Sequence, residues 1–466
     1  MKSLTLSNLC EALGRPNPLR REVRLSGVSI DSRTIQPGDC FFAIAGDRFD
    51  GHDFLEEAQR KQAACVVVQK EPPAKLSIPV IRVDDTVDSL GQLAAWYRRR
   101  LSGIVIAVTG SAGKTTTRHI LHHVLSRRFR CCQAPKSFNN QIGVPLTLLA
   151  ARQDDEIVLV EIGSNHPGEI APLSRMAGPD IALITHIAPA HLEGMGSVEA
   201  IIQEKASILK GLTPAGKAYI NGDIPELVGY LRQHYPHNLI PVGEGADCLV
   251  RPEQMHTCGT SGWIQLEGQV VRVPMPGQAS LRNTLMAWAV CRDLGVNLSD
   301  FAEAVQSASP PEMRLQVEHL GPITLLVDCY NASPASMENA VDCLARIARL
   351  QGRRSVFIAG DMMELGTESG RLHRQLGRFA ARHEIAVILA AGQFAHALLE
   401  GAQETDNNCA GGRLRLAFGT VEALCNNLHL YIRPDDIILI KASRSVRLER
   451  VVGRLRELFG KEQTTI

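Results

Sequence analysis

The chain has 466 residues, of which 45% are hydrophobic and 21% are charged, and its formal net charge is +1. At roughly 100–200 residues per domain, this length predicts about three globular domains. A net charge this close to zero gives no indication of a broad electrostatic surface for nucleic acid or for a membrane, although a local cationic pocket would not show in the total. No apolar run approaches the roughly 18 residues that a membrane span needs.

The N-terminus and the cysteines indicate a cytoplasmic protein. The segment MKSLTLSNLCEALG carries one Lys and no long apolar run, which predicts a short amphipathic helix and not a signal peptide. The 12 cysteines are scattered, and no CxxC pair occurs. A zinc site or redox motif is therefore not indicated, and reduced cytosolic thiols fit best.

Residues 1–100 mix short strands with turns and predict a small α/β domain. The patterns favour a helix over 53–61, followed by an apolar run over 64–68, and a second helix over 88–100. We interpret the charges that end this second helix, Arg98, Arg99 and Arg100, as a solvated face.

From Leu101 onward, strands alternate with helices, which predicts parallel sheets covered on both faces. We expect a central domain over 101–312 with a P-loop-type parallel sheet, and a C-terminal Rossmann-like α/β domain over 313–466. The fold class is therefore α/β with three domains. The expected strands are 104–108, 157–162, 181–185, 218–220, 323–328, 355–359, 386–390 and 437–440, and the clearest helices are 115–125, 336–350 and 368–383.

The strongest chemical signal is the segment IVIAVTGSAGKTTT. A strand runs into a Gly-rich turn and then into a helix, so inward-pointing N–H groups and the helix N-terminus predict a site for the phosphates of ATP. Lys114 would reach the β- and γ-phosphates, and Thr115 or Thr116 would offer a hydroxyl to Mg²⁺. The match to the general pattern is incomplete, because Val108 stands where its first Gly would fall.

Polar residues also follow the next strands of the predicted central sheet. Glu161 ends the strand in LVEIGSNHPGEI, and His186 and His191 follow the strand before IAPAHLEGMGS. Ligands of parallel sheets bind at the carboxyl ends of the strands, so Glu161 is a candidate ligand for Mg²⁺ beside the phosphates. Lys205 follows on a helix, where residue type alone indicates a surface lysine.

The third unit carries a similar group. Asp328 ends its first strand, in LLVDCYNASPASMENA, and Asn331 opens the following turn. An aspartate at a strand end suits a ribose hydroxyl or an amine, whereas the serines of this segment are explained fully as helix caps. Lys441 and Arg444 come just after the last strand and could hold an anionic group or face water.

Together these segments resemble the Mur ligases over nearly the whole chain. SIDSRTIQPGDCFFAIAGDRFDGHDF resembles the first domain of that family, which holds the uridine diphosphate end of a nucleotide-sugar, and TGSAGKTTT resembles its ATP loop. FNNQIGVPLTLL, EIGSNHPGEI and IAPAHLEGMGS resemble central-domain signatures, and DCYNASPASMENA and GDMMELG resemble those of the third domain. The resemblance implies a monomeric, ATP- and Mg²⁺-dependent ligase. It would join D-alanyl-D-alanine to a UDP-N-acetylmuramoyl tripeptide through an acyl phosphate, in peptidoglycan precursor synthesis.

The resemblance also implies roles for individual residues. Lys205 matches the lysine that is carbamylated in many of these ligases, which turns a cation into an anionic metal ligand. The implied catalytic residues are Lys114, Glu161, His191 and Lys205, and the implied metal ligands are Thr115, Glu161, His191 and Lys205. The implied ATP-binding residues are Gly110, Ser111, Ala112, Gly113, Lys114, Thr115, Thr116, Asn283, Arg314 and Asp328. The implied substrate-binding residues are Ser29, Asp31, Ser32, Arg33, Asn139, Asn140 and Asn331.

The chain departs from the family pattern at several of these positions. Ala279 and Ser280 replace a His-Asn pair, which predicts fewer or rebuilt contacts to adenine and weaker discrimination between ATP and other nucleoside triphosphates than in relatives. The other departures are His186 for Asn, Ser207 for Glu, and Met313 and Ala442 for glycines. Two alternatives stay open: a sister ligase such as MurE, and a degenerate relative that binds nucleotide and regulates a partner. For any of these functions, a nucleotide that contacts both the central and the third domain would bridge them. We therefore expect the two domains to move about a hinge near 309–311.

Overall fold

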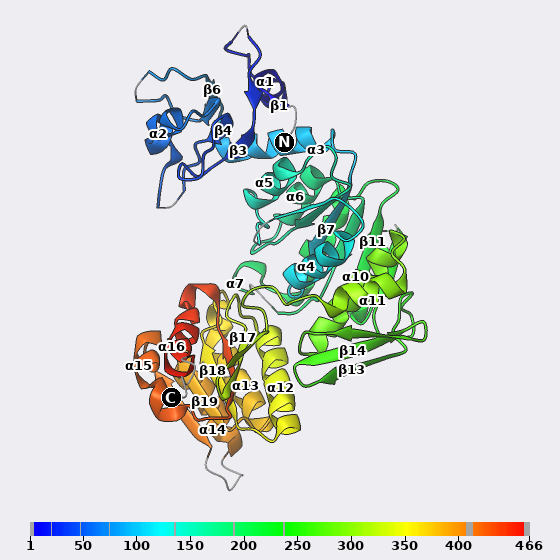
Figure 1. Ribbon diagram of the computed structural model, residues 1–466, viewed down its shortest axis with the longest axis vertical. Coiled ribbons are helices and arrows are strands. Elements are labelled where there is room, and N and C mark those ends of the chain that lie inside the picture. Colours follow the sequence, from blue (N-terminus) through cyan, green and yellow to red (C-terminus); the bar gives the residue numbers. More distant parts are fainter. Residues whose placement is uncertain are drawn as a thin grey trace, which may run out of the picture.

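The computed structural model describes residues 4–19, 21–46, 48–73, 75–134, 137–189, 192–235, 238–406 and 413–460. Figure 1 shows three α/β units in chain order, from blue through green to red. Each contains a sheet whose strands are all parallel or nearly all parallel. The α/β fold class is therefore confirmed. Within the described part of the chain, no helix is long and apolar enough to cross a membrane.

The first unit holds a four-stranded parallel sheet in the order β3-β4-β5-β6. Strands β4 and β5 are buried along their whole length, because both of their faces are covered. The predicted helix over 53–61 is divided in the structure into a 3-10 turn at Gly51–Phe54 and the helix α2. The elements are β1 (Leu4–Thr5), α1 (Leu6–Leu13), β2 (Arg24–Leu25), β3 (Gly27–Ser29), β4 (Asp39–Phe42), α2 (Leu55–Arg60), β5 (Cys65–Val68), β6 (Val80–Arg82) and α3 (Thr86–Arg98).

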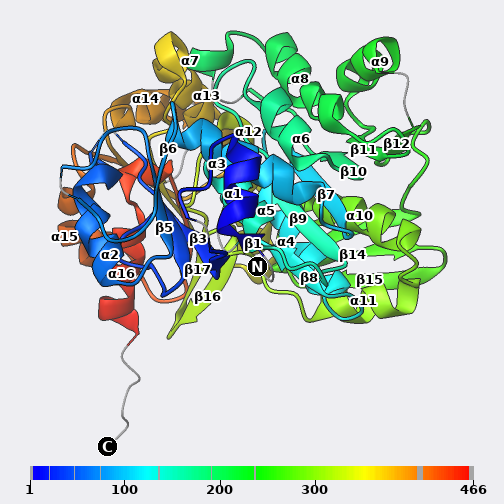
Figure 2. The same cartoon turned by 90° about the horizontal axis from the view of Figure 1, so that it is seen from above.

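Helix α3 joins the first unit to the second. Its apolar side contributes Leu93, Trp96 and Tyr97 to a core that also contains residues of α1 and of the central sheet. The solvated face that we predicted at its end is wrong for Arg98, because this guanidinium donates to the carbonyl oxygens of Ala177 and Gly178 and pairs with Asp180 at 2.8 Å. Figure 2 shows α3 between the blue N-terminal elements and the central helices.

The central unit contains a six-stranded parallel sheet in the order β12-β11-β10-β7-β9-β8. The middle strand β7 is flanked by β9 and β10, so the carboxyl ends of these three strands lie side by side. The elements are β7 (Ile104–Thr109), α4 (Lys114–Leu125), β8 (Cys131–Gln133), α5 (Gly143–Ala150), β9 (Ile157–Glu161), α6 (Ile170–Ala177), β10 (Ile181–Ile184), α7 (Leu192–Met195), α8 (Val198–Ala206), β11 (Lys217–Asn221), α9 (Pro225–His234), β12 (Asn238–Val242), α10 (Gln278–Asp293) and α11 (Leu298–Gln306).

A three-stranded antiparallel sheet, which the sequence patterns did not indicate, follows β12. Its strands are β13 (Gln254–Cys258), β14 (Ser261–Leu266) and β15 (Gln269–Val273). One face is buried against the central core through Ile264, Leu266 and Val271, and the other face is more exposed. Such alternation is typical of a sheet covered on one side.

The third unit contains a six-stranded sheet in the order β16-β17-β21-β18-β19-β20, in which only β16 is antiparallel to its neighbour. Strand β21 lies between β17 and β18, so the residues that follow these three strands meet at one edge. The elements are β16 (Gln316–Leu320), β17 (Ile323–Val327), α12 (Pro334–Gln351), β18 (Ser355–Gly360), α13 (Ser369–Arg382), β19 (Val387–Ala391), α14 (Ala395–Asp406), β20 (Leu414–Phe418), α15 (Val421–Tyr431), β21 (Ile437–Lys441) and α16 (Glu449–Phe459).

Candidate active site

A cavity of about 1820 Å³ lies where the second and third units face each other, with α3 forming part of its wall. It brings together most of the residues that the sequence indicated. Gly110, Lys205 and the four residues expected at the nucleotide-sugar do not line it. Its predicted lining residues are Ser111, Ala112, Gly113, Lys114, Thr115, Thr116, Asn139, Asn140, Glu161, Asn283, Arg314, Asp328 and Asn331.

The loop between β7 and α4 is braced against the residues that follow β10. The N–H of Ser111 donates to the carbonyl oxygen of His186 at 2.7 Å, and the Thr185 hydroxyl donates to the carbonyl oxygen of Ala112 at 2.6 Å. Gly110 has a φ of 144°, and a Cβ there would lie 2.2 Å from the Thr185 Oγ1. Only glycine fits this close approach, so the loop conformation depends on it.

The loop also presents groups that suit a phosphate. Helix α4 begins at Lys114, whose Nζ donates to the carbonyl oxygen of Gly110 at 2.7 Å. Burial lowers the pKa of Lys114, Glu161 opposes this effect, and Arg314 adds to it. The buried Ser111 hydroxyl has no hydrogen-bond partner among the described residues. A buried ammonium, an unpaired hydroxyl and a helix N-terminus fit an anion.

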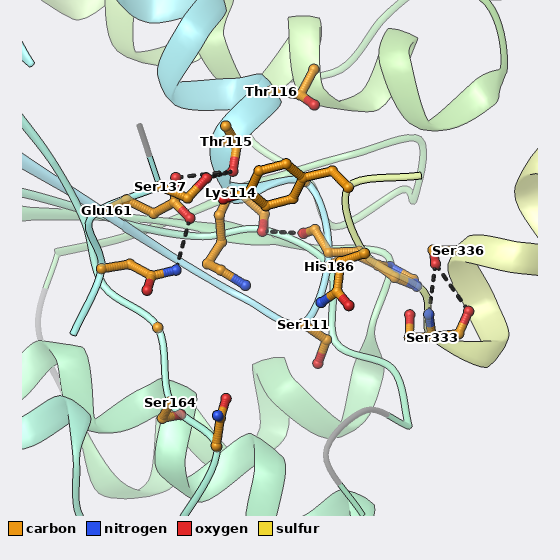
Figure 3. Close-up of a pocket in the computed structure, with 18 of the residues that line it drawn as sticks. Ser111, Lys114, Thr115, Thr116, Ser137, Glu161, Ser164, His186, Ser333 and Ser336 are labelled. Atoms are coloured by element: carbon orange, nitrogen blue, oxygen red, sulfur yellow. Dashed lines mark hydrogen bonds between the residues drawn. The ribbon is translucent and has the colours of Figure 1, made fainter. Parts of the chain in front are cut away.

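Glu161, at the end of β9, accepts hydrogen bonds from several neighbours. Its side chain is 1% exposed, and its carboxylate accepts from the Thr115 hydroxyl at 3.0 Å and from the Asn139 amide at 3.1 Å. Arg118, which no sequence motif indicated, places its Nε 3.4 Å from the same carboxylate and also contacts Gln133. Figure 3 shows Thr115, Ser137 and Glu161 on one side of Lys114.

Two of these groups are of the type that could bind magnesium. The described residues hold no cluster of three or more His, Cys, Asp or Glu side chains placed to bind a metal. Glu161 and Thr115 nevertheless contribute two adjacent oxygen atoms, the ligand type that Mg²⁺ prefers. His191, the implied histidine ligand, lies outside the described residues.

Lys205 is buried, which corrects the interpretation as a surface lysine. It is 2% exposed, and its Nζ donates to the Ser164 hydroxyl at 2.7 Å and to the Ser164 carbonyl oxygen at 3.4 Å. Burial lowers its pKa to about 7, with a further contribution from Lys114 and opposition from Glu204. The hydrogen bonds of this buried lysine go to Ser164 and not to a carboxylate. Such an arrangement is unusual and indicates a chemical role.

The third unit faces these groups with a buried ion pair. Asp328 and Lys441 lie 2.7 Å apart, at the ends of two adjacent strands, and Asp328 also accepts from the N–H of Leu315 at 3.2 Å. The guanidinium of Arg314 lies over the Tyr330 ring at 4.4 Å. Asn331 is exposed, and Ser333 lies at the N-cap of α12 as predicted. Figure 3 shows Ser333 and Ser336 across the cavity from Lys114.

The residues expected at the nucleotide-sugar form a separate group at the end of β3. Asp31 pairs with Arg33 at 2.7 Å, and hydrogen bonds from Arg33 lower the pKa of Asp31 to about 2. Ser29 donates to the Asp31 carbonyl oxygen, and the Ser32 carbonyl oxygen accepts from Lys61. Asn140, in contrast, lines the main cavity and accepts from the N–H of Gly143 at the start of α5.

Comparison with known proteins identifies the family. The chain matches the models for the Mur ligase family, catalytic domain over residues 24–98, the Mur ligase middle domain over 108–291 and the Mur ligase, glutamate ligase domain over 313–444. It is 33% identical to the UDP-N-acetylmuramoyl-tripeptide–D-alanyl-D-alanine ligase of Escherichia coli (strain K12), over 98% of this chain and 99% of that protein. The corresponding ligase of Bacillus subtilis (strain 168) is 32% identical over 97% and 98%.

Solved structures agree with these relatives. A crystal structure of MurF from Acinetobacter baumannii is 30% identical, with a TM-score of 0.86 over 97% of this chain and 98% of that chain. MurF ligase from Thermotoga maritima in complex with ADP is 28% identical, with a TM-score of 0.79 over 93% and 97%. The chain therefore belongs to the Mur ligase family, and within that family it groups with the MurF proteins.

Proposed function

We propose that this chain is an ATP-dependent ligase that adds D-alanyl-D-alanine to a UDP-N-acetylmuramoyl tripeptide, in peptidoglycan precursor synthesis. The observation that carries the proposal is the meeting of Lys114, Glu161 and Asp328 in one cavity, in a chain that covers 99% of the length of its E. coli relative of that name. The same geometry would suit a sister ligase such as MurE. The E. coli and B. subtilis relatives, however, are both named as ligases that add D-alanyl-D-alanine, which favours the present proposal.

The reaction must overcome the poor electrophilicity of a carboxylate. Transfer of the γ-phosphoryl group of ATP to a carboxylate oxygen of the tripeptide forms an acyl phosphate and releases ADP. The neutral amine of the dipeptide then attacks the carbonyl carbon, the C–O bond to phosphate breaks, and a proton leaves the nitrogen. The work of the protein is positioning and charge stabilisation, since phosphoryl transfer asks for little covalent chemistry from side chains.

In our proposal that work falls to the loop between β7 and α4, residues 110–113, together with the start of α4. We call this segment the phosphate loop. Lys114 turns from the Gly110 carbonyl oxygen to the β- and γ-phosphates, which provide the negative charge that its buried ammonium lacks. Gly110, Ser111, Ala112 and Gly113 would shape the loop around the phosphates, and the N–H groups of Thr115 and Thr116, in the first turn of α4, would donate to them. Arg314, Asp328 and Asn283 contact the nucleotide from the two sides of the cavity, and Asn331 lies near the dipeptide.

We also propose Thr115, Glu161, His191 and Lys205 as the residues that hold Mg²⁺. When bound there, Mg²⁺ would neutralise charge on the transferred phosphoryl group. Lys205 would serve as its carbamate, formed when the neutral amine adds to CO₂ and releases a proton. Its burial supports this role, because a carbamate there would give Lys205 a negative charge opposite the ammonium of Lys114.

The three units would divide the substrates among them. We propose domain boundaries at 1–100, 101–312 and 313–466, with Ser29, Asp31, Ser32 and Arg33 at the uridine diphosphate end. Asn139 and Asn140 would contact the tripeptide end near Glu161, which Asn139 already touches. The enzyme would work as a monomer in the cytoplasm, in keeping with cysteines that are all unpaired among the described residues.

Phosphate release tests the proposal directly. Purified chain, ATP, Mg²⁺ and a UDP-N-acetylmuramoyl tripeptide should release phosphate only when D-alanyl-D-alanine is added, and the product mass should rise by one dipeptide less water. Release that depends on a free amino acid in place of the dipeptide would favour a sister ligase. ATP binding without release under any pairing would favour a regulatory relative that has lost catalysis.

A further inference from the structure

The start of α10 and one face of α12 lie opposite each other and extend the phosphate site. A Cβ at Gly113 would lie 2.5 Å from the Asn283 amide oxygen, so Asn283 touches the phosphate loop. Ala279 lies one turn earlier on the same face of α10 and lines the cavity. Just before this helix, a Cβ at Gly277 would lie 3.6 Å from the Asn339 amide of α12. Six helical residues span about 9 Å, a length suited to the part of a nucleotide beyond its phosphates.

Helix α10 itself offers few free polar groups along this path. Ala279 presents only a methyl group, and the Ser280 hydroxyl donates to the Pro276 carbonyl oxygen at 2.7 Å. Arg282 is directed toward Glu244, at 3.3 Å. Met275 and Met286, both buried, provide apolar surface to the cavity. Apart from Asn283, which touches the phosphate loop, this side of the cavity offers apolar surface to the flat face of a base.

Helix α12 supplies what α10 lacks. Glu338 and Asn339 line the same cavity, and neither side chain forms a hydrogen bond or an ion pair with any described residue. Asp342, one turn further along this face, is already paired with Arg346 at 2.9 Å. Burial raises the pKa of Glu338, as expected for a carboxylate without a polar partner. A solvated helix face would explain one free polar side chain. It does not explain why Glu338 and Asn339, which both line the cavity, are free while Asp342 is paired.

We propose that Glu338 and Asn339 recognise the adenine of ATP from the third unit. The inference rests on the proposed function, and it assigns base recognition to two residues of α12. The Asn339 amide would accept a hydrogen bond from the adenine N6 amino group and donate one to N7, a pairing that an asparagine makes readily. Glu338 would accept the second N6 hydrogen. Guanine carries O6 at that position, so its lone pairs would face the carboxylate, and GTP would be rejected by repulsion.

Direct binding measurements test this assignment without requiring catalysis. ATP and GTP affinities are compared by calorimetry for the unaltered chain and for Glu338→Gln, Asn339→Ala and Asp342→Asn. We expect the unaltered chain to prefer ATP by about tenfold or more. Glu338→Gln should raise GTP affinity, because the new amide can donate to O6, and Asn339→Ala should weaken ATP binding by about tenfold. Asp342→Asn removes the same charge from the same helix face and should change the ratio by less than about twofold.

The outcomes separate the inference from the function on which it rests. An ATP-to-GTP ratio that stays the same in Glu338→Gln and Asn339→Ala would overturn the inference while leaving the ligase proposal intact, and so would an equal shift in Asp342→Asn. Equal binding of ATP and GTP by the unaltered chain would also overturn it. Failure of the unaltered chain to bind either nucleotide would overturn both the inference and the proposed ATP site.

Discussion

Thr115 donates its hydroxyl hydrogen to Glu161 across 3.0 Å, which ties the first turn of α4 to the last residue of β9. Arg118, one turn further along α4, approaches the same carboxylate and is itself 4% exposed. The helix that begins at the phosphate loop therefore fixes the candidate metal ligand from two positions. This relationship makes a prediction about stability that does not depend on the reaction.

Arg118→Met should destabilise the fold by about 3 kcal/mol, because it leaves the buried Glu161 carboxylate without its cation. Chemical denaturation of the purified variant measures this loss. Adding Glu161→Gln to Arg118→Met should restore at least half of the stability, since no unpaired charge then remains. Arg127→Met removes a more exposed arginine that follows α4 and should cost less than about 1 kcal/mol. Equal losses in Arg118→Met and Arg127→Met would contradict the prediction.

Lys114→Ala should abolish ligation and leave the fold intact, because in our proposal the ammonium binds the phosphates and contributes little to the core. Phosphate release and the thermal unfolding midpoint are measured on the same sample. Activity above about a tenth of the original, a barrier change below about 1.4 kcal/mol, would show that the assignment of Lys114 is wrong. Lys210→Ala, at an exposed lysine near Lys205, is the matched control and should retain full activity.

Lys205 should carry a carbamate that forms from its neutral amine. Carbon-13 NMR of protein incubated with labelled bicarbonate should show one carbamate signal that is absent from Lys205→Ala. Because burial lowers the pKa of the amine to about 7, protonation should weaken the signal as the pH falls below that value. Lys205→Ala should be inactive, and a short-chain carboxylic acid should restore part of its activity. A signal that persists in Lys205→Ala would place the modification elsewhere.

The second and third units should move toward each other when ligands bind. The phosphate loop and Glu161 belong to one unit, and Asp328 and Arg314 lie on the other side of the cavity, so a nucleotide that contacts both favours a closed state. Small-angle scattering should record a smaller radius of gyration with ATP and the nucleotide-sugar than without them. Lys114→Ala should show no such change. An unchanged radius of gyration in the unaltered chain would contradict closure of the two units, and the exclusion of water from the acyl phosphate would then have no explanation.

The sequence predicted the parts of this molecule whose determinants are local. The strand, the glycine turn and the helix around Lys114 lie within a few residues of each other, so their pattern indicated both their structure and their chemistry. Apolar runs such as β9 and β21 were placed to within one residue or two, because buried parallel strands differ clearly from their surroundings.

The determinants that were missed depend on distant partners. Arg118 is a helix residue like many others until β9 places Glu161 beside it, and Arg98 became a cap for α6 only through a contact 79 residues away. The burial of Lys205 likewise depends on Ser164, 41 residues earlier in the chain. The antiparallel strands β13 to β15 were overlooked because their alternation is short and mixed in polarity.

The position of α3 has a practical consequence for dissecting this protein. Leu93, Trp96 and Tyr97 pack into a core shared with the central sheet, and the Tyr97 hydroxyl donates to the Ala151 carbonyl oxygen at 2.7 Å. A fragment that starts at residue 101 would expose this apolar surface to water and is expected to aggregate on expression. A fragment that starts before Asp85, the residue that caps α3, would keep this helix against the central sheet and should be more soluble than the fragment that starts at residue 101.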